Sequence, residues 1–193
     1  ASALVSQEFY ESDESRGFKG GLQLQALRGQ GPLTTALGGY GLRVPWGQCH
    51  MRNFSARFGH SLSLTVTCDD LPEDTNRIAL HATQIDRNGL PVPRMIYRVG
   101  ENSQKMLDYG IQRASEALRE AGARQIAVNP LTRNGGFHLM GTARMGVDHQ
   151  AGVTDAHGRV HGMKGLSIVD ASTFVTAAAV NPTPTLQAIA LRA

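Results

Sequence analysis

The sequence has few cysteines, few aromatic residues and no long apolar run. Cys49 and Cys68 are its two cysteines; they form no C-x-x-C pair and are too few for a disulfide scaffold, so the redox compartment stays open. The aromatic fraction is 6% and the charged fraction 18%, whereas the hydrophobic fraction of 41% is ordinary for a globular protein. No apolar stretch approaches the roughly 20 residues that a membrane-spanning helix needs. At 193 residues the chain can form one core, or one domain with part of another.

Several nucleotide-binding and catalytic motifs are also missing. The chain contains no G-x-S-x-G, no Walker A sequence and no G-x-G-x-x-G, so the pyrophosphate site of any dinucleotide would lie elsewhere. The net charge of +3 is carried by scattered Lys and Arg residues, which gives little support to nucleic-acid binding. The N-terminus has neither an initiator methionine nor a basic leader region, and we expect a processed chain or a piece of a longer one.

Alternating apolar and polar residues predict the strands. They indicate strands over 18–27 and 61–68, and two more over 76–84 and 90–99. The pair Asn88-Gly89 between the last two predicts a tight hairpin, because that turn needs positive φ values. Shorter apolar segments predict additional strands. They are RQIAV (124–128) and LSIVD (166–170).

A long helix is predicted after the hairpin. An apolar stripe at helical spacing runs from Leu107 to Ala121, with Asn102 or Ser103 as the N-cap and Gly122 as the stop. The predicted fold class is α+β: an antiparallel sheet of four to six strands with this helix packed on it, completed by a C-terminal strand and helix. Residues 28–58 are rich in glycine and contain single aromatic residues. We interpret them as loop and short helix, which could form a lid over a site.

His138 is the first candidate for chemistry. It lies between the glycine pair 135–136 and Gly141-Thr142, and glycines on both sides allow the backbone to approach another surface closely. Histidine titrates near neutral pH, so His138 is a candidate general base. A hydrogen-bonded loop histidine is the competing interpretation. His157 and His161 are four residues apart, but the glycines beside them and the absence of a cysteine or carboxylate set argue against zinc.

Asn181 is the second candidate, because Asn181-Pro182-Thr183-Pro184 is typical of the start of a helix. In one interpretation Asn181 only caps that helix. In the other, the helix N-terminus offers free N–H groups and a partial positive charge to an anionic group, such as a reduced flavin.

Three segments together resemble the C-terminal signature of the glucose-methanol-choline (GMC) flavoprotein oxidoreductases. They are HLMGTARMG from His138, GVTDAHGRVHGMKGLSIVDAS from Gly152 and NPTPTLQAIALRA from Asn181. The upstream sequences LPEDTNRIAL and NGLPVPRMIYRV are similar to strands of that family's substrate domain, so the resemblance extends from about Leu71 to the end.

The resemblance implies a function for each segment. His138 would be the catalytic base and Asn181 its partner on the substrate oxygen, while Asp170 and Ala171 would lie along FAD and Asn181, Pro182 and Thr183 would meet the isoalloxazine ring. The family's N-terminal FAD-binding portion is absent from this chain, so this chain alone is expected to be inactive. The implied division is a connector, strand and lid-like region over 1–60, a substrate-binding sheet domain over 61–151 and a segment over 152–193 that completes the FAD-binding layer.

The reaction implied is oxidation of an alcohol group of a sugar, polyol or other alcohol by hydride transfer to FAD, most similar to bacterial sugar and polyol dehydrogenases. The electron acceptor would be a quinone, a cytochrome or oxygen. An oxidase that uses oxygen and a non-catalytic fragment or binding module without FAD are the alternatives. Both the cell envelope or periplasm and the cytoplasm remain open as locations.

Overall fold

The computed structural model describes residues 4–38, 44–129, 131 and 136–193. The chain divides into two compact units. The first is formed by Ala1–Cys68 and Lys105–Gly135, and the second by Asp69–Gln104 and Gly136–Ala193. Each unit is described by itself below.

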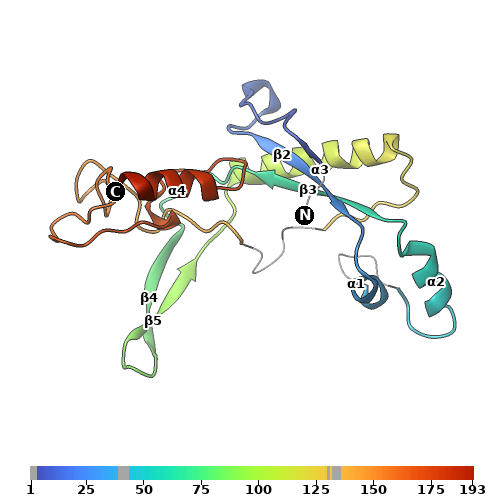
Figure 1. The fold of residues 1–193 in the computed structure, drawn as a ribbon, viewed down its shortest axis with the longest axis horizontal. Coiled ribbons are helices and arrows are strands. Elements are labelled where there is room, and N and C mark those ends of the chain that lie inside the picture. The colour runs from blue at the N-terminus through green and yellow to red at the C-terminus, as the bar shows by residue number, and fades with distance from the viewer. Residues whose placement is uncertain (1–3, 39–43, 130, 132–135) are drawn as a thin grey trace. The chain divides into compact units, whose positions relative to one another are not determined.

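The first unit is built on a three-stranded antiparallel sheet. Its strands are β1 (Leu4–Ser6), β2 (Leu22–Arg28) and β3 (Leu62–Cys68), with β2 in the centre (Figure 1). The register pairs Leu24 of β2 with Val66 of β3. Two short helices, α1 (Pro32–Leu37) and α2 (His50–Arg57), lie in the connection between β2 and β3. A 3-10 turn, η1 (Glu14–Arg16), precedes β2.

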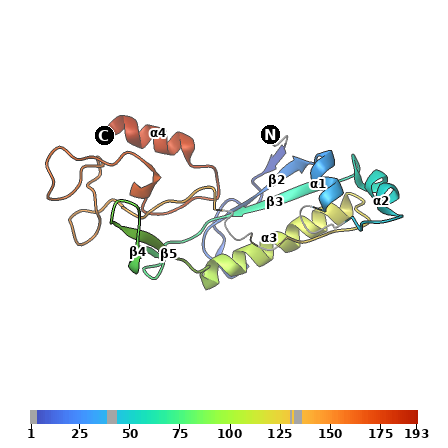
Figure 2. The same cartoon turned by 90° about the horizontal axis from the view of Figure 1, so that it is seen from below.

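Helix α3 (Glu101–Glu120) packs on this sheet and closes the core of the first unit (Figure 2). Met106 and Ala114 of the helix are buried against Phe18, Leu22 and Leu24. Gly110 permits the close packing, because a Cβ atom there would lie 2.5 Å from a methyl carbon of Val66. The first four residues of α3 belong to the second unit by their contacts.

The second unit has little regular structure. It contains the hairpin of β4 (Arg77–Ile85) and β5 (Pro91–Ile96), the 3-10 turn η3 (Ala171–Thr173) and helix α4 (Thr183–Arg192). At the hairpin tip the Asp86 carboxylate accepts the backbone N–H groups of Asn88 and Leu90, and Gly89 has a φ of 80°. The remaining backbone of this unit forms turns.

The α+β class, the predicted hairpin and the long helix are confirmed. The strands over 18–27 and 61–68 are present as β2 and β3, and Gly122 ends α3 in the left-handed conformation, with its N–H bonded to the carbonyl of Arg119. The strand number was too high: the described residues form a three-stranded sheet and a separate two-stranded hairpin in place of one sheet of four to six.

Three local predictions were wrong. Residues 124–128 form no strand. Residues 166–170 contribute only an isolated bridge between Ser167 and Arg159, made by two backbone bonds. Glycine turns on both sides of the partner segment stop it from continuing as a ladder. The N-cap of α3 is neither Asn102 nor Ser103, since the Gly100 carbonyl already accepts the Gln104 N–H at 2.9 Å. The division into 1–60, 61–151 and 152–193 concerns functional surfaces and stays a prediction.

Candidate functional site

His138 lies in a bend of the second unit, and its side chain is exposed. Within the described part of the chain its imidazole has no hydrogen-bond partner. Gly135 of the predicted glycine flank lies outside the described residues. Gly136 is described, and a Cβ atom there would lie 2.9 Å from a methyl carbon of Leu139. This contact lies within the His138 segment itself, so the predicted approach of its backbone to another surface stays a prediction at Gly136.

The segment after His138 is bound to the segment that contains Asp170. Three alternate N–H groups, those of Gly141, Ala143 and Met145, donate to the carbonyls of Ala171, Ser172 and Thr173 at 3.1, 2.8 and 2.9 Å. These three bonds hold residues 141–145, which include a turn at 142–143, against residues 171–173. The structure therefore joins two of the three sequence segments that carry the resemblance.

Gly141 is required at this junction. Its φ is +83°, and a Cβ atom there would lie 3.3 Å from the carbonyl oxygen of Phe174. A side chain would be strained by the backbone conformation and would also press on the segment opposite. The glycine of the sequence H-x-x-G-T therefore brings the backbone beside His138 against the Asp170 segment.

Asp170 is the N-cap of η3. Its carboxylate accepts the backbone N–H of Ser172 at 2.8 Å, and hydrogen bonding by Ser172 holds the pKa of Asp170 below its usual value. The carboxylate thus stays ionised and shapes the turn that presents the carbonyls of 171–173 to the His138 segment. A contact with FAD remains a prediction for Asp170 and Ala171.

Asn181, Pro182 and Thr183 form the entry to α4. The Pro182 carbonyl accepts the Leu186 N–H at 2.9 Å, so Pro182 is the N-cap, and no side chain caps the helix. The interpretation of Asn181 as a simple cap is therefore wrong, and its exposed side chain is left for another partner. No contact between His138 and Asn181 is found among the described residues.

The other end of α4 is fastened to a glycine turn. The Arg192 guanidinium donates to the carbonyl of Ala156 at 2.8 Å, and Nδ1 of His157 lies 3.4 Å from the Arg192 carbonyl. A carbonyl can only accept, so Nδ1 of His157 is the protonated nitrogen. These contacts tie the helix that begins beside Asn181 to the rest of its unit.

Two aspartates organise the backbone between these segments. Asp148 accepts the N–H groups of Gln150 and Ala151 at 2.9 and 3.0 Å, and Asp155 accepts those of His157 and Arg159 at 2.8 and 3.0 Å. The bonds to Asp155 hold its pKa below the usual value. We did not predict these roles from the sequence, although an aspartate two residues before an N–H donor is a known turn signal.

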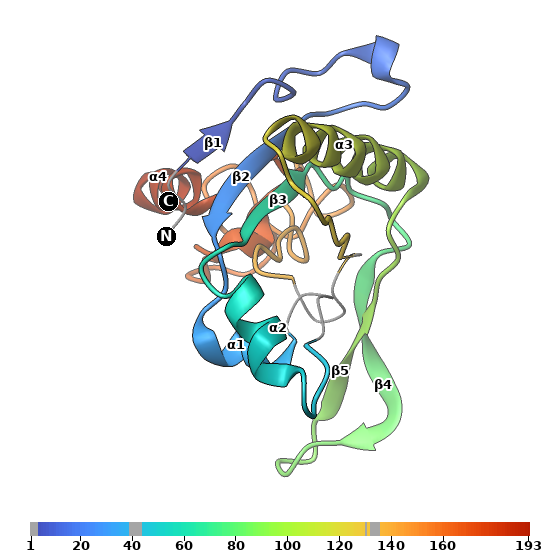
Figure 3. The same cartoon turned by 90° about the vertical axis from the view of Figure 1, so that its right-hand side faces the viewer.

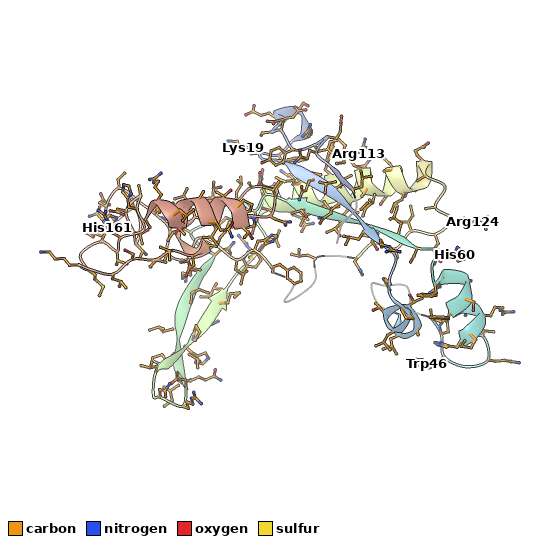
Figure 4. The ribbon with its side chains drawn as sticks, in the orientation of Figure 1. Lys19, Trp46, His60, Arg113, Arg124 and His161 are labelled. Atoms are coloured by element: carbon orange, nitrogen blue, oxygen red, sulfur yellow. The ribbon has the colours of Figure 1, made fainter. Side chains whose placement is uncertain are left out.

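His161, like His157, makes a structural contact with the backbone of this unit. His161, labelled in Figure 4, has Nε2 3.1 Å from the Gly146 carbonyl, which assigns the proton to Nε2. Within the described ranges no group of three or more His, Cys, Asp or Glu side chains could hold a metal ion. Cys49 and Cys68 of the first unit form no disulfide.

The residues that the resemblance assigns to FAD are compatible with a flavin. The N–H groups of Thr183 and Thr185 precede the first bond within α4, and Asn181 and Thr183 are exposed, so the uncapped positive end of the helix is accessible. Such an end suits the anionic part of a reduced flavin.

Two open cavities, of about 470 and 610 Å³, are lined by other residues. The first lies in the first unit between β1, β2 and α3, and the second borders residues 159–167. Neither contains His138 or Asn181.

Comparison with protein families identifies one match. The family model described as GMC oxidoreductase matches residues 72–190 of this chain, which includes the first two segments, most of the third and both candidate residues.

Curated relatives are bacterial oxidoreductases. The chain is 38% identical to 2-methyl-1,2-propanediol dehydrogenase of Mycolicibacterium austroafricanum over 98% of its own length and 35% of that protein. It is 34% identical to 6'''-hydroxyparomomycin C oxidase of Streptomyces lividus, over 80% of the chain and 28% of that enzyme. It is 30% identical to the fructose dehydrogenase large subunit of Gluconobacter japonicus, over 71% and 25%. The chain thus spans about a third or less of the length of these relatives.

Proposed function

The chain belongs to the GMC oxidoreductase family, and we propose that it supplies the proton-transfer side of an FAD-dependent site that oxidises an alcohol group. The proposed substrates are sugars, polyols or other small alcohols, because the relatives include enzymes named for a propanediol, fructose and an aminoglycoside. The observation that carries the proposal is the set of three backbone bonds between 141–145 and 171–173, since it ties the His138 segment to the proposed flavin-facing segment.

His138 is proposed to accept the hydroxyl proton of the substrate. An alcohol C–H bond loses hydride readily only when its O–H proton is removed in step, because the forming carbonyl needs the electron density of the oxygen. The exposed imidazole of His138 is free to take that proton. The side-chain amide of Asn181 would donate a hydrogen bond to the same oxygen and hold it in place. When bound, FAD supplies the hydride acceptor.

Replacement of His138 tests this proposal. In the complete protein, His138→Ala should slow reduction of the flavin by substrate by roughly 10²–10⁴-fold, the usual contribution of a general base. FAD content should stay unchanged, because His138 is not assigned to FAD binding. Stopped-flow absorbance of the flavin measures the rate, and extraction of the cofactor measures occupancy.

A matched variant separates this role from a general effect of losing a surface histidine. His149 is exposed on the same unit and has no proposed role, so His149→Ala should reduce the flavin at the wild-type rate. If His138→Ala also reduces the flavin rapidly, the assignment of His138 as the base is wrong.

The identity of the electron acceptor distinguishes two types of enzyme, a dehydrogenase and an oxidase that uses oxygen. We favour a dehydrogenase over an oxidase on the similarity to 2-methyl-1,2-propanediol dehydrogenase, which covers nearly the whole chain. Reoxidation of the reduced flavin in aerated buffer decides the point, because an oxidase returns to the oxidised spectrum rapidly with oxygen. A complete protein that purifies without flavin would instead support a non-catalytic binding module.

A further inference from the structure

Helix α1 of the first unit exposes its apolar residues and buries a polar one. Leu33 and Leu37, one turn apart, are 71% and 61% exposed. Thr35 is buried, and its hydroxyl donates to the Gly31 carbonyl at 2.9 Å. A surface helix normally shows the opposite arrangement. The outer face of α1 is therefore apolar without a partner in the described structure of its unit.

Helix α2 contacts α1 (Figure 3), and apolar side chains at its start are exposed as well. Trp46 just before the helix and Met51 in its first turn are 75% and 68% exposed. The indole of Trp46 stacks on the imidazole of His50 with ring centroids 4.5 Å apart and planes within 2°. This stacking holds the large aromatic side chain in an exposed position (Figure 4). We call Leu33, Leu37, Trp46 and Met51, together with Arg28 and Arg52, the α1–α2 surface.

The charge on this part of the chain is of one sign. Residues 17–68 contain no Asp and no Glu, whereas Arg28 at the end of β2 and Arg52 in α2 are exposed cations. The guanidinium of Arg52 donates to Sγ of Cys49 at 3.2 Å, and no described carboxylate forms an ion pair with it. Residues 17–68 therefore offer no carboxylate that would repel an anionic partner, and the attraction of that partner to Arg28 and Arg52 would not be weakened by such repulsion.

We propose that the α1–α2 surface docks the protein on an anionic phospholipid membrane. Exposed leucine, tryptophan and methionine side chains beside arginines form the composition of peripheral segments that lie in the headgroup layer. The arginines would bind lipid phosphates, and the indole of Trp46 would enter the interface. In the described structure no helix is long and apolar enough to cross a membrane, so docking of this kind would be peripheral.

A lipid surface fits better than an acidic protein. Protein partners usually seat apolar anchors in shaped pockets, and the two cavities described above are lined by none of the residues of the α1–α2 surface. Two short helices that present separated apolar side chains suit a soft, deformable layer. This inference is independent of the proposed chemistry at His138.

Vesicle flotation with the complete protein tests the proposal. The protein should float with vesicles of phosphatidylcholine and phosphatidylglycerol and should remain in solution with phosphatidylcholine alone. Binding should weaken as salt is raised, because the Debye length shortens to about 3 Å at 1 M salt. Trp46 is the single tryptophan of this chain. The difference in emission between wild type and Trp46→Phe should shift to shorter wavelength on addition of the anionic vesicles.

Two sets of variants identify the surface. Arg28→Glu/Arg52→Glu should weaken binding at least about tenfold, since each cation near such a membrane contributes about a fivefold gain in affinity. Leu33→Gln/Leu37→Gln should also lose flotation. These side chains are exposed, so circular dichroism should show the wild-type fold. The matched controls are Arg119→Glu on the solvated side of α3 and Leu80→Gln in β4, both exposed and outside the surface, which should float normally.

Equal binding to neutral and anionic vesicles, or full binding by the arginine variants, overturns the proposal. Failure of the wild-type protein to float with the anionic vesicles also overturns it, including the case in which it instead binds an acidic protein through Arg28 and Arg52.

Discussion

The first unit and residues 136–193 of the second unit are held together by different forces. The first unit buries Leu22 and Met106 completely, together with other apolar side chains of β2 and α3. In residues 136–193 the two fully buried larger side chains are Thr154 and Thr173, both polar. Around them the backbone is fixed by bonds between turns and by aspartate carboxylates. Apolar packing stabilises the first region, whereas turn geometry stabilises the second.

This difference has a consequence for function. A packed sheet and helix tolerate many sequences of similar volume, so the first unit can support a surface that varies. A backbone held by glycine turns and aspartate carboxylates tolerates few substitutions. Each aspartate accepts particular backbone N–H groups, and each glycine leaves room for a backbone segment that passes close to it. The proposed catalytic residues lie in this second region, where placement of the backbone matters more than burial.

The largest expected effect is in the core of the first unit. Leu22→Ala should lower the free energy of unfolding by about 2–5 kcal/mol, because Leu22 is fully buried and its removal leaves a cavity against α3. Hydrogen exchange should accelerate in β2, β3 and α3 and stay unchanged in residues 136–193. Leu62→Ala on the same sheet, at an exposed position, is the control and should cost under about 1 kcal/mol. Uniform acceleration in both regions would show that they unfold as one.

Gly158→Ala should produce the next largest effect, in the second region. The φ of Gly158 is +72°, and an added Cβ would lie 2.5 Å from the Ile168 carbonyl oxygen, so we expect a cost of about 2–4 kcal/mol. Gly162→Ala is a close control: its φ is +76°, but nothing lies within 4 Å of the added atom, so it should cost only about 1–2 kcal/mol. Equal losses, measured by thermal unfolding, would mean that close approach contributes nothing here.

Asp155 should make stability pH-dependent to a smaller extent. Its folded pKa is lowered by the Arg159 and His157 N–H groups, so the stability it contributes is present above its unfolded pKa of about 3.9. That contribution is lost as the pH falls through the lower folded value. Asp155→Asn should therefore flatten the fall in melting temperature on acidification below about pH 4. A variant curve parallel to that of wild type would contradict the role of the Asp155 carboxylate.

Thr154→Val should have the smallest effect, and of opposite sign. The hydroxyl of Thr154 is buried and has no hydrogen-bond partner among the described residues, so an apolar replacement of the same shape should be neutral or stabilising by up to about 1 kcal/mol. Thr173 is equally buried, but its hydroxyl donates to the Asp170 carbonyl at 3.0 Å, so Thr173→Val should cost about 1 kcal/mol. Chemical denaturation of both variants compares them directly, and an equal loss would indicate a partner for the Thr154 hydroxyl.

Sequence patterns predicted the elements whose signals are local. The alternation over 61–68, the Asn88-Gly89 turn and the apolar stripe from Leu107 gave β3, the hairpin and α3, because period and turn chemistry depend on neighbouring residues. LSIVD was predicted as a strand from its apolar run, but a strand requires a partner segment. The glycine turns of 158–165 leave it one bridge with two backbone bonds.

The candidate site divides in the same way. Residue type and motif alone pointed to His138 and Asn181, and the family match covers both. Their roles in catalysis are predictions that the experiments on the complete protein address. The bonds between 141–145 and 171–173 could not be read from the sequence, because they join segments about thirty residues apart and use only backbone atoms, which every residue possesses.

The sequence by itself therefore determined the α+β class, the GMC family and the two residues proposed to handle the substrate oxygen. Only the tertiary structure showed that Gly141 and Gly158 are needed for close backbone approach, that Pro182 and not Asn181 caps α4, and that α1 turns its leucines outward. The physical reason is that helical and strand periodicity depends on residues that are neighbours in the sequence. Close backbone approach, capping and exposure depend on which atoms, distant in the sequence, the fold places next to a residue.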